Sequence, residues 1–215
     1  MSTVAAVIFD LDGVLLDSEQ AWDQARRDLV AETGGRWTDT ATRDMMGMSS
    51  KEWPVYVRDE LQVPLSADEI NAEVVRRMIE GYRIALPLLP GARQAVERLA
   101  AVRPLGLASS SNREVIDAVL DAMGVDHLFE VTVSSEEVGR GKPAPDVWLE
   151  AARRLDTAPG DCVAIEDSEN GIKSAHAAGM RVFAIPNPHF PPAAEALALA
   201  TVLPDLSALT ADRLL

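Results

Sequence analysis

The sequence is poor in basic residues. Its 215 residues include 20 Lys or Arg against 34 Asp or Glu, which gives a formal net charge of −14 at pH 7. Nucleic acids and anionic membrane surfaces are bound through clustered Lys and Arg, and the sequence contains no basic run. We therefore expect neither a nucleic acid nor a membrane as a partner.

Cysteine and long apolar segments are also scarce. Cys162 is the only cysteine, so no intramolecular disulfide can form, and we expect a cytoplasmic protein. The apolar run Val4–Phe9 has no basic flank, is shorter than a signal-peptide core and leads into two aspartates. We interpret this run as a buried strand, and nothing in the sequence resembles a transmembrane segment.

Short apolar runs bounded by Gly, Pro, Asp or Ser predict six central strands. After residue 90 these runs alternate with helical patterns, which is typical of a doubly wound, Rossmann-like α/β fold with a parallel sheet. The predicted strands are Val4–Phe9, Leu105–Ala108, Val131–Val133, Cys162–Ile165, Val182–Ile185 and Thr201–Leu203. The predicted helices are Gly91–Ala100, Arg113–Met123, Asp146–Leu155, Gly171–Ala178 and Ala193–Ala200.

The region between the first strand and Pro87 contains only helical patterns, at Ser18–Glu32, Thr40–Met46, Lys51–Glu60 and Ala67–Ala85. The proline-bounded stretch that follows reads as a return linker, because proline stops helices and stiffens a hinge. The pattern therefore predicts a helical domain, residues 17–87, inserted into a core made of residues 1–16 and 88–215.

Two acidic pairs follow predicted strands. Asp10 and Asp12 come after the first strand, and Glu166 and Asp167 come after the run that starts at Cys162. Open α/β sheets bind ligands at the carboxyl ends of their strands, so the four carboxylates could converge. Crowded carboxylates raise one another's pKa unless a hard divalent cation lies among them, which favours Mg²⁺. The alternatives are a plain turn for the first pair and a solvated helix-entry turn for the second.

Two further segments carry groups that suit a phosphate. Leu107–Asn112 follows a strand and opens a helix, so hydroxyls and backbone N–H groups gather at the positive end of the helix. Helix capping by Ser111 or Asn112 is the alternative, and both readings can hold together. Lys142 lies in a turn rich in Gly and Pro and could supply a cation to a phosphoryl group, although a surface turn is the default for such a composition.

In this order, the four segments resemble the haloacid dehalogenase-like phosphatase superfamily. The branch they resemble contains β-phosphoglucomutases, 2-deoxyglucose-6-phosphate phosphatases and other sugar phosphatases. The match spans essentially the whole chain, and its motifs are weak singly but specific together. They are FDLDGVLLDSE at Phe9–Glu19, LASSSN at Leu107–Asn112, GKPAPD at Gly141–Asp146 and IEDSENGIKSAHAAGM at Ile165–Met180.

The resemblance implies a role for each matching residue. Asp10 would attack phosphorus and become an aspartyl-phosphate, while Asp12 would protonate the leaving oxygen and later activate water. Mg²⁺ would be bound by the Asp10 carboxylate, the Asp12 carbonyl, Asp167 and, directly or through water, Glu166. Phosphoryl oxygens would be held by Ser109 and Lys142, and neighbouring contacts to the substrate would come from Ser110 and Asn112.

The resemblance also implies that the inserted helical domain selects the substrate. The loop Met46–Ser50 matches the specificity loop of the family, so Gly47, Met48 and Ser49 would face the substrate together with Trp22. The alternative for Trp22 is packing inside the helical domain, since it shares helical spacing with Ala25 and Leu29.

The sequence departs from β-phosphoglucomutase at three positions, because Trp22, Met46 and Ser50 stand where that enzyme has a histidine, a lysine and an arginine. The changes remove cations that would hold a second phosphate, which favours simple hydrolysis. We therefore expect a monomeric, Mg²⁺-dependent phosphatase acting on a small phosphorylated metabolite, with a phosphosugar mutase as the alternative. Asp12 argues against a dehalogenase or phosphonate hydrolase, and the complete motif set argues against a non-enzymatic binding protein.

Overall fold

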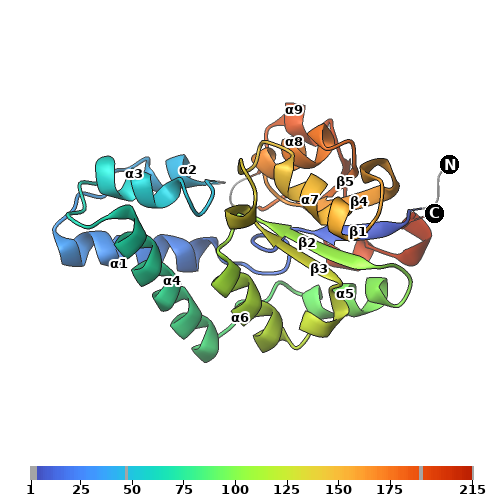
Figure 1. Cartoon of the computed structure of the whole chain (residues 1–215), viewed down its shortest axis with the longest axis horizontal. Helices are drawn as coiled ribbons and strands as arrows, with labels where there is room; N and C mark the ends of the chain where they lie inside the picture. Colours follow the sequence, from blue (N-terminus) through green and yellow to red (C-terminus); the bar gives the residue numbers. More distant parts are fainter. Residues whose placement is uncertain (1–3, 47, 189–190, 215) are drawn as a thin grey trace.

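The computed structural model describes residues 4–46, 48–188 and 191–214. Its centre is one sheet of six parallel strands in the order β3-β2-β1-β4-β5-β6, which confirms the predicted doubly wound α/β fold (Figure 1). The strands are β1 (Ala6–Phe9), β2 (Leu105–Ser109), β3 (Val131–Ser134), β4 (Cys162–Glu166), β5 (Arg181–Ala184) and β6 (Thr201–Val202).

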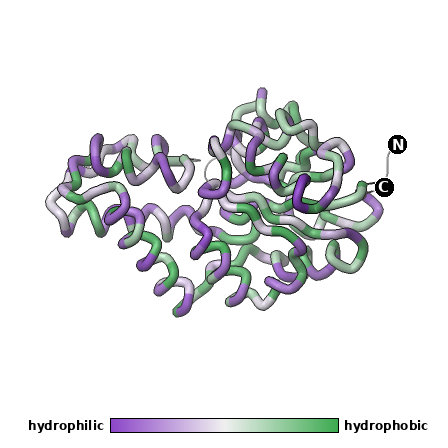
Figure 2. Tube along the Cα trace, viewed as in Figure 1, coloured by the Kyte–Doolittle hydropathy of each residue, from purple (hydrophilic) through white to green (hydrophobic). Residues whose placement is uncertain are grey.

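Helices cover both faces of the sheet. Side chains alternate along β1, so that Val7 and Phe9 enter the hydrophobic cluster under α5 and α6, whereas Ala6 and Ile8 enter the cluster under α7 and α8. Figure 2 shows the apolar character of these central strands. The covering helices are α5 (Ala92–Ala100), α6 (Arg113–Met123), α7 (Asp146–Arg154), α8 (Glu169–Ala177) and α9 (Ala194–Leu197).

The register of the three middle strands brings their carboxyl ends together. Phe9 of β1 lies opposite Leu107 of β2 and Ile165 of β4. The N–H of Asp10 continues the ladder by donating to the Ile165 carbonyl at 2.9 Å. Residues that directly follow these strands therefore share one edge of the sheet, where open α/β folds bind their ligands.

Four helices between β1 and α5 project from one end of the sheet, and we call them the cap (Figure 1). Leu16 forms bridges with Asp12 and with Leu88, so the outgoing and returning connections run side by side. No helix in the described part of the chain combines the length and apolar composition needed to cross a membrane. The cap helices are α1 (Glu19–Thr33), α2 (Ala41–Met45), α3 (Trp53–Asp59) and α4 (Ala67–Ile84).

Three predicted helices differ from the observed ones by two or more residues at one end. Helix α3 begins at Trp53, two residues after the predicted start at Lys51. Helix α8 begins at Glu169, two residues before the predicted start, because the Ser168 hydroxyl caps it by accepting the Gly171 N–H at 3.1 Å. The alanine-rich segment after Pro192 forms only the short α9. Short 3₁₀ helices occur at Asp126–Leu128, Ser135–Glu137, Pro159–Asp161, Leu206–Ala208 and Ala211–Leu214.

Candidate active site

Three carboxylates meet at the carboxyl ends of β1 and β4. One oxygen from each of Asp10, Glu166 and Asp167 lies within 4.8 Å of the other two, and all three residues are buried. Three of the four carboxylates expected to converge thus meet at one edge of the sheet, whereas the Asp12 carboxylate is not part of this group. A set of oxygen donors this compact and this acidic suits a hard divalent cation.

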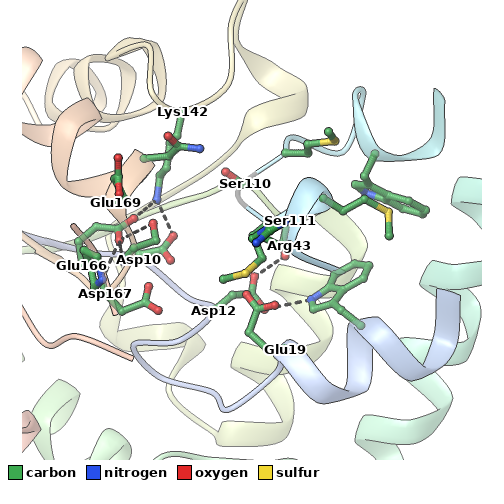
Figure 3. Close-up of a pocket in the computed structure, with 18 of the residues that line it drawn as sticks. Asp10, Asp12, Glu19, Arg43, Ser110, Ser111, Lys142, Glu166, Asp167 and Glu169 are labelled. Carbon is green, nitrogen blue, oxygen red and sulfur yellow. Dashed lines mark hydrogen bonds and ion pairs between the residues drawn. The ribbon is translucent and has the colours of Figure 1, made fainter. Parts of the chain in front are cut away.

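Lys142 contributes a buried cation to this group. Its Nζ atom donates to Asp10 Oδ1 and to Glu166 Oε1, each at 2.7 Å (Figure 3). The ammonium also lies 4.6 Å from the centre of the Trp148 ring, an arrangement that stabilises a desolvated cation. The Lys142 side chain is only 4% exposed, so it points inward from a turn in which Arg140 and Pro143 are exposed. A purely solvated role for Lys142 is therefore wrong.

The two acidic residues at the end of β4, Glu166 and Asp167, differ in their hydrogen bonding. Oε1 of Glu166 is engaged by Lys142, and Oε2 accepts the N–H groups of Asp167 and Ser168, both at 2.7 Å. The Asp167 carboxylate accepts no hydrogen bond from any residue that the structure describes. Of the two, Asp167 is therefore the group free to bind a cation directly.

Two glycines make room for these carboxylates. A Cβ atom on Gly13, which has a φ of +77°, would lie 2.0 Å from an oxygen of Asp167. A Cβ atom on Gly171 would lie 1.6 Å from Oε1 of Glu166. Any larger residue at either position would displace a carboxylate, so the observed geometry of the site requires glycine at both positions.

Burial and neighbouring charges shift the pKa values of Asp10, Asp167 and Lys142. Burial raises the pKa of Asp10 from 3.8 to about 7, repulsion from Glu166 and Asp12 adds to this, and Lys142 opposes it. Burial and the charge of Glu166 likewise raise the pKa of Asp167 well above its usual value. Burial works against the charge of Lys142, but the two carboxylates outweigh it and raise its pKa. The Lys142 ammonium balances only one of the three carboxylate charges. The remaining negative charge and the oxygen donors suit a Mg²⁺ ion.

Asp12 holds its carboxylate apart from this group, on the side of the cap (Figure 3). Its Oδ1 accepts the Ser18 hydroxyl at 2.5 Å and the Trp22 indole N–H at 3.2 Å, and its Oδ2 accepts the Ser111 hydroxyl. These bonds come from the connection before α1, from α1 itself and from the segment after β2. The contact with Trp22 ties this carboxylate to the first cap helix.

A pocket of about 440 Å³ separates the core from the cap, a size typical of small-molecule sites. Glu166, whose Oε2 also accepts the Ser168 hydroxyl at 3.0 Å, is one of the residues that line it. Most of the residues that the sequence assigns to the site line it: Asp10, Asp12, Trp22, Met48, Ser110, Asn112, Lys142, Glu166 and Asp167.

Two of the assigned residues that the structure describes do not line the pocket. Ser109 is fully buried, and its hydroxyl accepts the Ser111 N–H at 3.0 Å, so it shapes the turn after β2. Ser49 is also buried, and its hydroxyl donates to Glu52 at 2.7 Å. Gly47 lies outside the described residues.

The pocket also contains residues that the sequence argument missed. Glu19, Trp22 and Arg26 follow one another at spacings of three and four, so they share one face of α1, and all three line the pocket. That spacing was a usable signal for Glu19 and Arg26. Arg43 of α2 lines the pocket as well, so the three substitutions relative to β-phosphoglucomutase do not leave the cap side without cations. Other lining residues are Met45, Met46, Trp53, Ser111, Ser168, Glu169, Asn170, Pro191 and Pro192.

Comparison with known proteins assigns this architecture to a family. Residues 4–179 match the haloacid dehalogenase-like hydrolases. Hexitol phosphatase B of Escherichia coli (strain K12) is 37% identical over 194 residues, covering 86% of this chain and 85% of that protein. The bifunctional riboflavin kinase/FMN phosphatase of Arabidopsis thaliana is 32% identical over 185 residues, covering 85% of this chain, which spans only 48% of that protein.

A solved structure agrees with this assignment. The crystal structure of CbbY from Rhodobacter sphaeroides in complex with phosphate superimposes with a TM-score of 0.86 at 25% identity, covering 96% of each chain. The chain belongs to the haloacid dehalogenase-like hydrolases, and it is therefore an enzyme. This confirms the family that the four motifs indicate.

Proposed function

We propose that this chain is a Mg²⁺-dependent phosphatase that hydrolyses a small sugar phosphate or polyol phosphate through an aspartyl-phosphate on Asp10. The observation that carries the proposal is the contact of Lys142 Nζ with both Asp10 and Glu166 at 2.7 Å, beside Asp167. Such a group can bind a phosphoryl group between a metal and an ammonium. The similarity to hexitol phosphatase B supports a phosphorylated sugar or polyol as substrate.

The metal would be held by the Asp10 and Asp167 carboxylates and the Asp12 carbonyl. Glu166 would act through water, because both of its oxygens already accept hydrogen bonds from Lys142 and from backbone N–H groups. A bound Mg²⁺ supplies positive charge to the phosphoryl oxygens and keeps Asp10 ionised. The turn from Ser109 to Asn112 would hold these oxygens together with Lys142.

In the first step the Asp10 carboxylate forms a bond to phosphorus, and the bond from phosphorus to the ester oxygen breaks. Asp12 gives its proton to that departing oxygen. In the second step Asp12, now ionised, takes a proton from water, the water oxygen attacks phosphorus, and the bond to Asp10 breaks. Phosphate leaves and Asp10 is regenerated.

A screen of phosphate release tests this proposal. Sugar phosphates, polyol phosphates, nucleotides and phosphoglycolate are each incubated with the wild type and with Asp10→Asn, with and without Mg²⁺. We expect release that requires both Mg²⁺ and Asp10, since Asn cannot act as the nucleophile. Equal turnover by Asp10→Asn would contradict the proposal, and isomer formation that outruns phosphate release would favour a phosphosugar mutase.

A further inference from the structure

One face of α1 continues the pocket from the catalytic carboxylates into the cap. Glu19, Trp22 and Arg26 form this face, and we call it the α1 face. Trp22 fixes its position beside the candidate acid, because the indole N–H donates to Asp12 at 3.2 Å. Glu19 and Arg26 are seven residues apart in the helix, which separates them by about 10 Å along its axis.

Arg26 stacks on two aromatic rings and keeps N–H donors without a partner among the described residues. Its guanidinium lies 5.0 Å from the centre of the Trp22 ring and 4.9 Å from the centre of the Trp53 ring. The side chain makes no hydrogen bond or ion pair with any residue that the structure describes, and its buried Nε has no partner. Stacking on aromatic rings leaves the N–H groups at the edge of a guanidinium free to donate.

Glu19 supplies the complementary acceptor at the other end of the α1 face. Burial and the charge of Asp12 raise its pKa, and the charge of Arg26 opposes that shift. Within the described part of the chain its carboxylate has no hydrogen bond or ion pair, with Arg26 or with any other residue. An unpartnered acceptor and an unpartnered donor therefore face the same pocket from one helix.

The charges on the α1 face favour a neutral occupant over an anionic one. A second phosphate or a carboxylate on the substrate would be attracted by Arg26 but repelled by the Glu19 carboxylate, which has no partner within the described residues. Neutral hydroxyls both donate and accept hydrogen bonds, so they suit the donor and the acceptor together.

We propose that the α1 face is the specificity subsite, in which Arg26 donates to hydroxyl groups of the substrate's carbon chain and Glu19 accepts from them. The inference rests on the proposed phosphatase function and narrows it to monophosphates with a neutral, polyhydroxylated chain of several carbons. Arg43 is exposed on α2 and takes no part in this recognition.

The test compares two esters that differ in chain length. The kcat/KM for Mg²⁺-dependent phosphate release is measured on glucitol 6-phosphate and on glycerol 3-phosphate. The variants are Arg26→Met, Arg26→Lys and Glu19→Gln, and Arg36→Met is the matched control because Arg36 is an exposed cap arginine outside the pocket. We expect the wild type to prefer the longer ester, and Arg26→Met to lower that preference about tenfold, mainly through KM.

The variants distinguish substrate recognition by Arg26 from a packing role for this side chain. Arg36→Met should keep the wild-type preference, and Arg26→Lys should fall between wild type and Arg26→Met, because lysine keeps the charge but lacks the planar fork. A lowered Tm with an unchanged preference would make Arg26 a packing residue and overturn the inference. Faster turnover of fructose 1,6-bisphosphate that depends on Arg43 would also overturn it.

If Arg26→Met does not fold, the preference for the longer ester is measured in Arg26→Lys and Glu19→Gln instead. If no ester releases phosphate, the proposed function itself fails.

Discussion

Lys142 joins the two strands that carry the candidate site, because its ammonium contacts Asp10 after β1 and Glu166 at the end of β4. All three side chains are at least 92% buried. Buried charges of this kind depend on one another, since removal of one partner leaves the others desolvated and unpaired. These two contacts therefore stabilise the folded protein, and they also hold the Lys142 ammonium where it can bind a phosphoryl group.

Lys142→Met keeps the length of the side chain and removes its charge. We expect kcat for phosphate release to fall by at least about 100-fold, because the phosphoryl oxygens lose a charged donor. We also expect a lower Tm, since Asp10 and Glu166 lose their shared partner. Lys173→Met is the control, because Lys173 is exposed and pairs only with Glu169 on the surface of α8. Retained activity in Lys142→Met would show that phosphate release does not need the Lys142 ammonium.

The raised pKa of Asp10 predicts how Mg²⁺ binding depends on pH. The shift from 3.8 to about 7 means that, without metal, the folded protein binds more protons than the unfolded chain in this window. Its free energy of unfolding therefore falls as pH rises from about 4 to about 7. Mg²⁺ binds the ionised form, so its stabilising effect should grow across the same window.

Thermal unfolding with and without Mg²⁺ at several pH values measures this effect. We expect the increase in Tm caused by Mg²⁺ to be small near pH 5 and to reach its full size above about pH 7. Asp10→Asn should reduce the pH dependence, because asparagine does not titrate, and Asp167, whose pKa is also raised, should supply the part that remains. An increase in Tm that is the same at every pH would contradict the assignment of Asp10 as a ligand.

At the scale of elements, β4 and α8 hold the second acidic pair through close backbone packing. Gly171 lies in the first turn of α8, directly against the Glu166 carboxylate. Gly81 offers a matched comparison, because it also lies within a helix, α4, but has no atom within 4 Å of a Cβ position. The two helical glycines therefore differ in whether a neighbouring side chain occupies the space of a Cβ atom.

Gly171→Ala should displace Glu166 and with it one of the two contacts of Lys142. We expect a large loss of phosphate release together with a lower Tm. Gly81→Ala should keep the activity and stabilise the protein by about 0.5–1 kcal/mol, since alanine favours a helix over glycine. Kinetics and thermal unfolding of both variants check this pair. Equal behaviour of the two would show that the packing against Glu166 has no functional consequence.

Elements and catalytic motifs were largely predictable from the sequence, and the reasons are local. Apolar runs bounded by turn residues located all six strands, and three of the four carboxylates of the acidic pairs met at the ends of β1 and β4, as the parallel sheet predicts. Asp12 was expected to join them, but its carboxylate is held on the cap side by Ser18, Trp22 and Ser111. The start of α8 was misplaced because the cap at Ser168 depends on a single side-chain bond. Arg26 was missed because an arginine on a helix normally faces solvent, and its position here depends on Trp53 from another helix.

At the scale of the whole molecule, the cap contacts the core through two pairs of polar side chains. Ser50 Oγ lies 3.2 Å from Ser135 Oγ, and Asn112 Nδ2 donates to Asn71 Oδ1 at 3.1 Å. The loop that carries Lys142 also packs on the cap, because a Cβ atom on Gly141 would lie 2.8 Å from the Ser49 Cβ. A cap in contact with the catalytic loop can exclude water from the pocket and select the substrate.

Gly141→Ala tests this contact, since it should push the cap away from the Lys142 loop. We expect kcat/KM to fall about tenfold, with both kcat and KM affected, as for other closure contacts. Gly139→Ala is the control, because its nearest neighbour, an oxygen of Asp146, would lie at an ordinary 3.5 Å from the Cβ. Kinetics indistinguishable from the wild type in Gly141→Ala would mean that cap position does not limit turnover.

The central claim is that Asp10 carries the phosphoryl group during turnover beside a bound Mg²⁺. The most direct measurement is rapid acid quenching of a single turnover, followed by mass spectrometry of peptides that contain Asp10. The account predicts a phosphorylated Asp10 peptide that appears and decays with Mg²⁺ present and is absent when Mg²⁺ is chelated. Substrate turnover with no phosphoryl group on Asp10 at any time, or with the group on another residue, would contradict it.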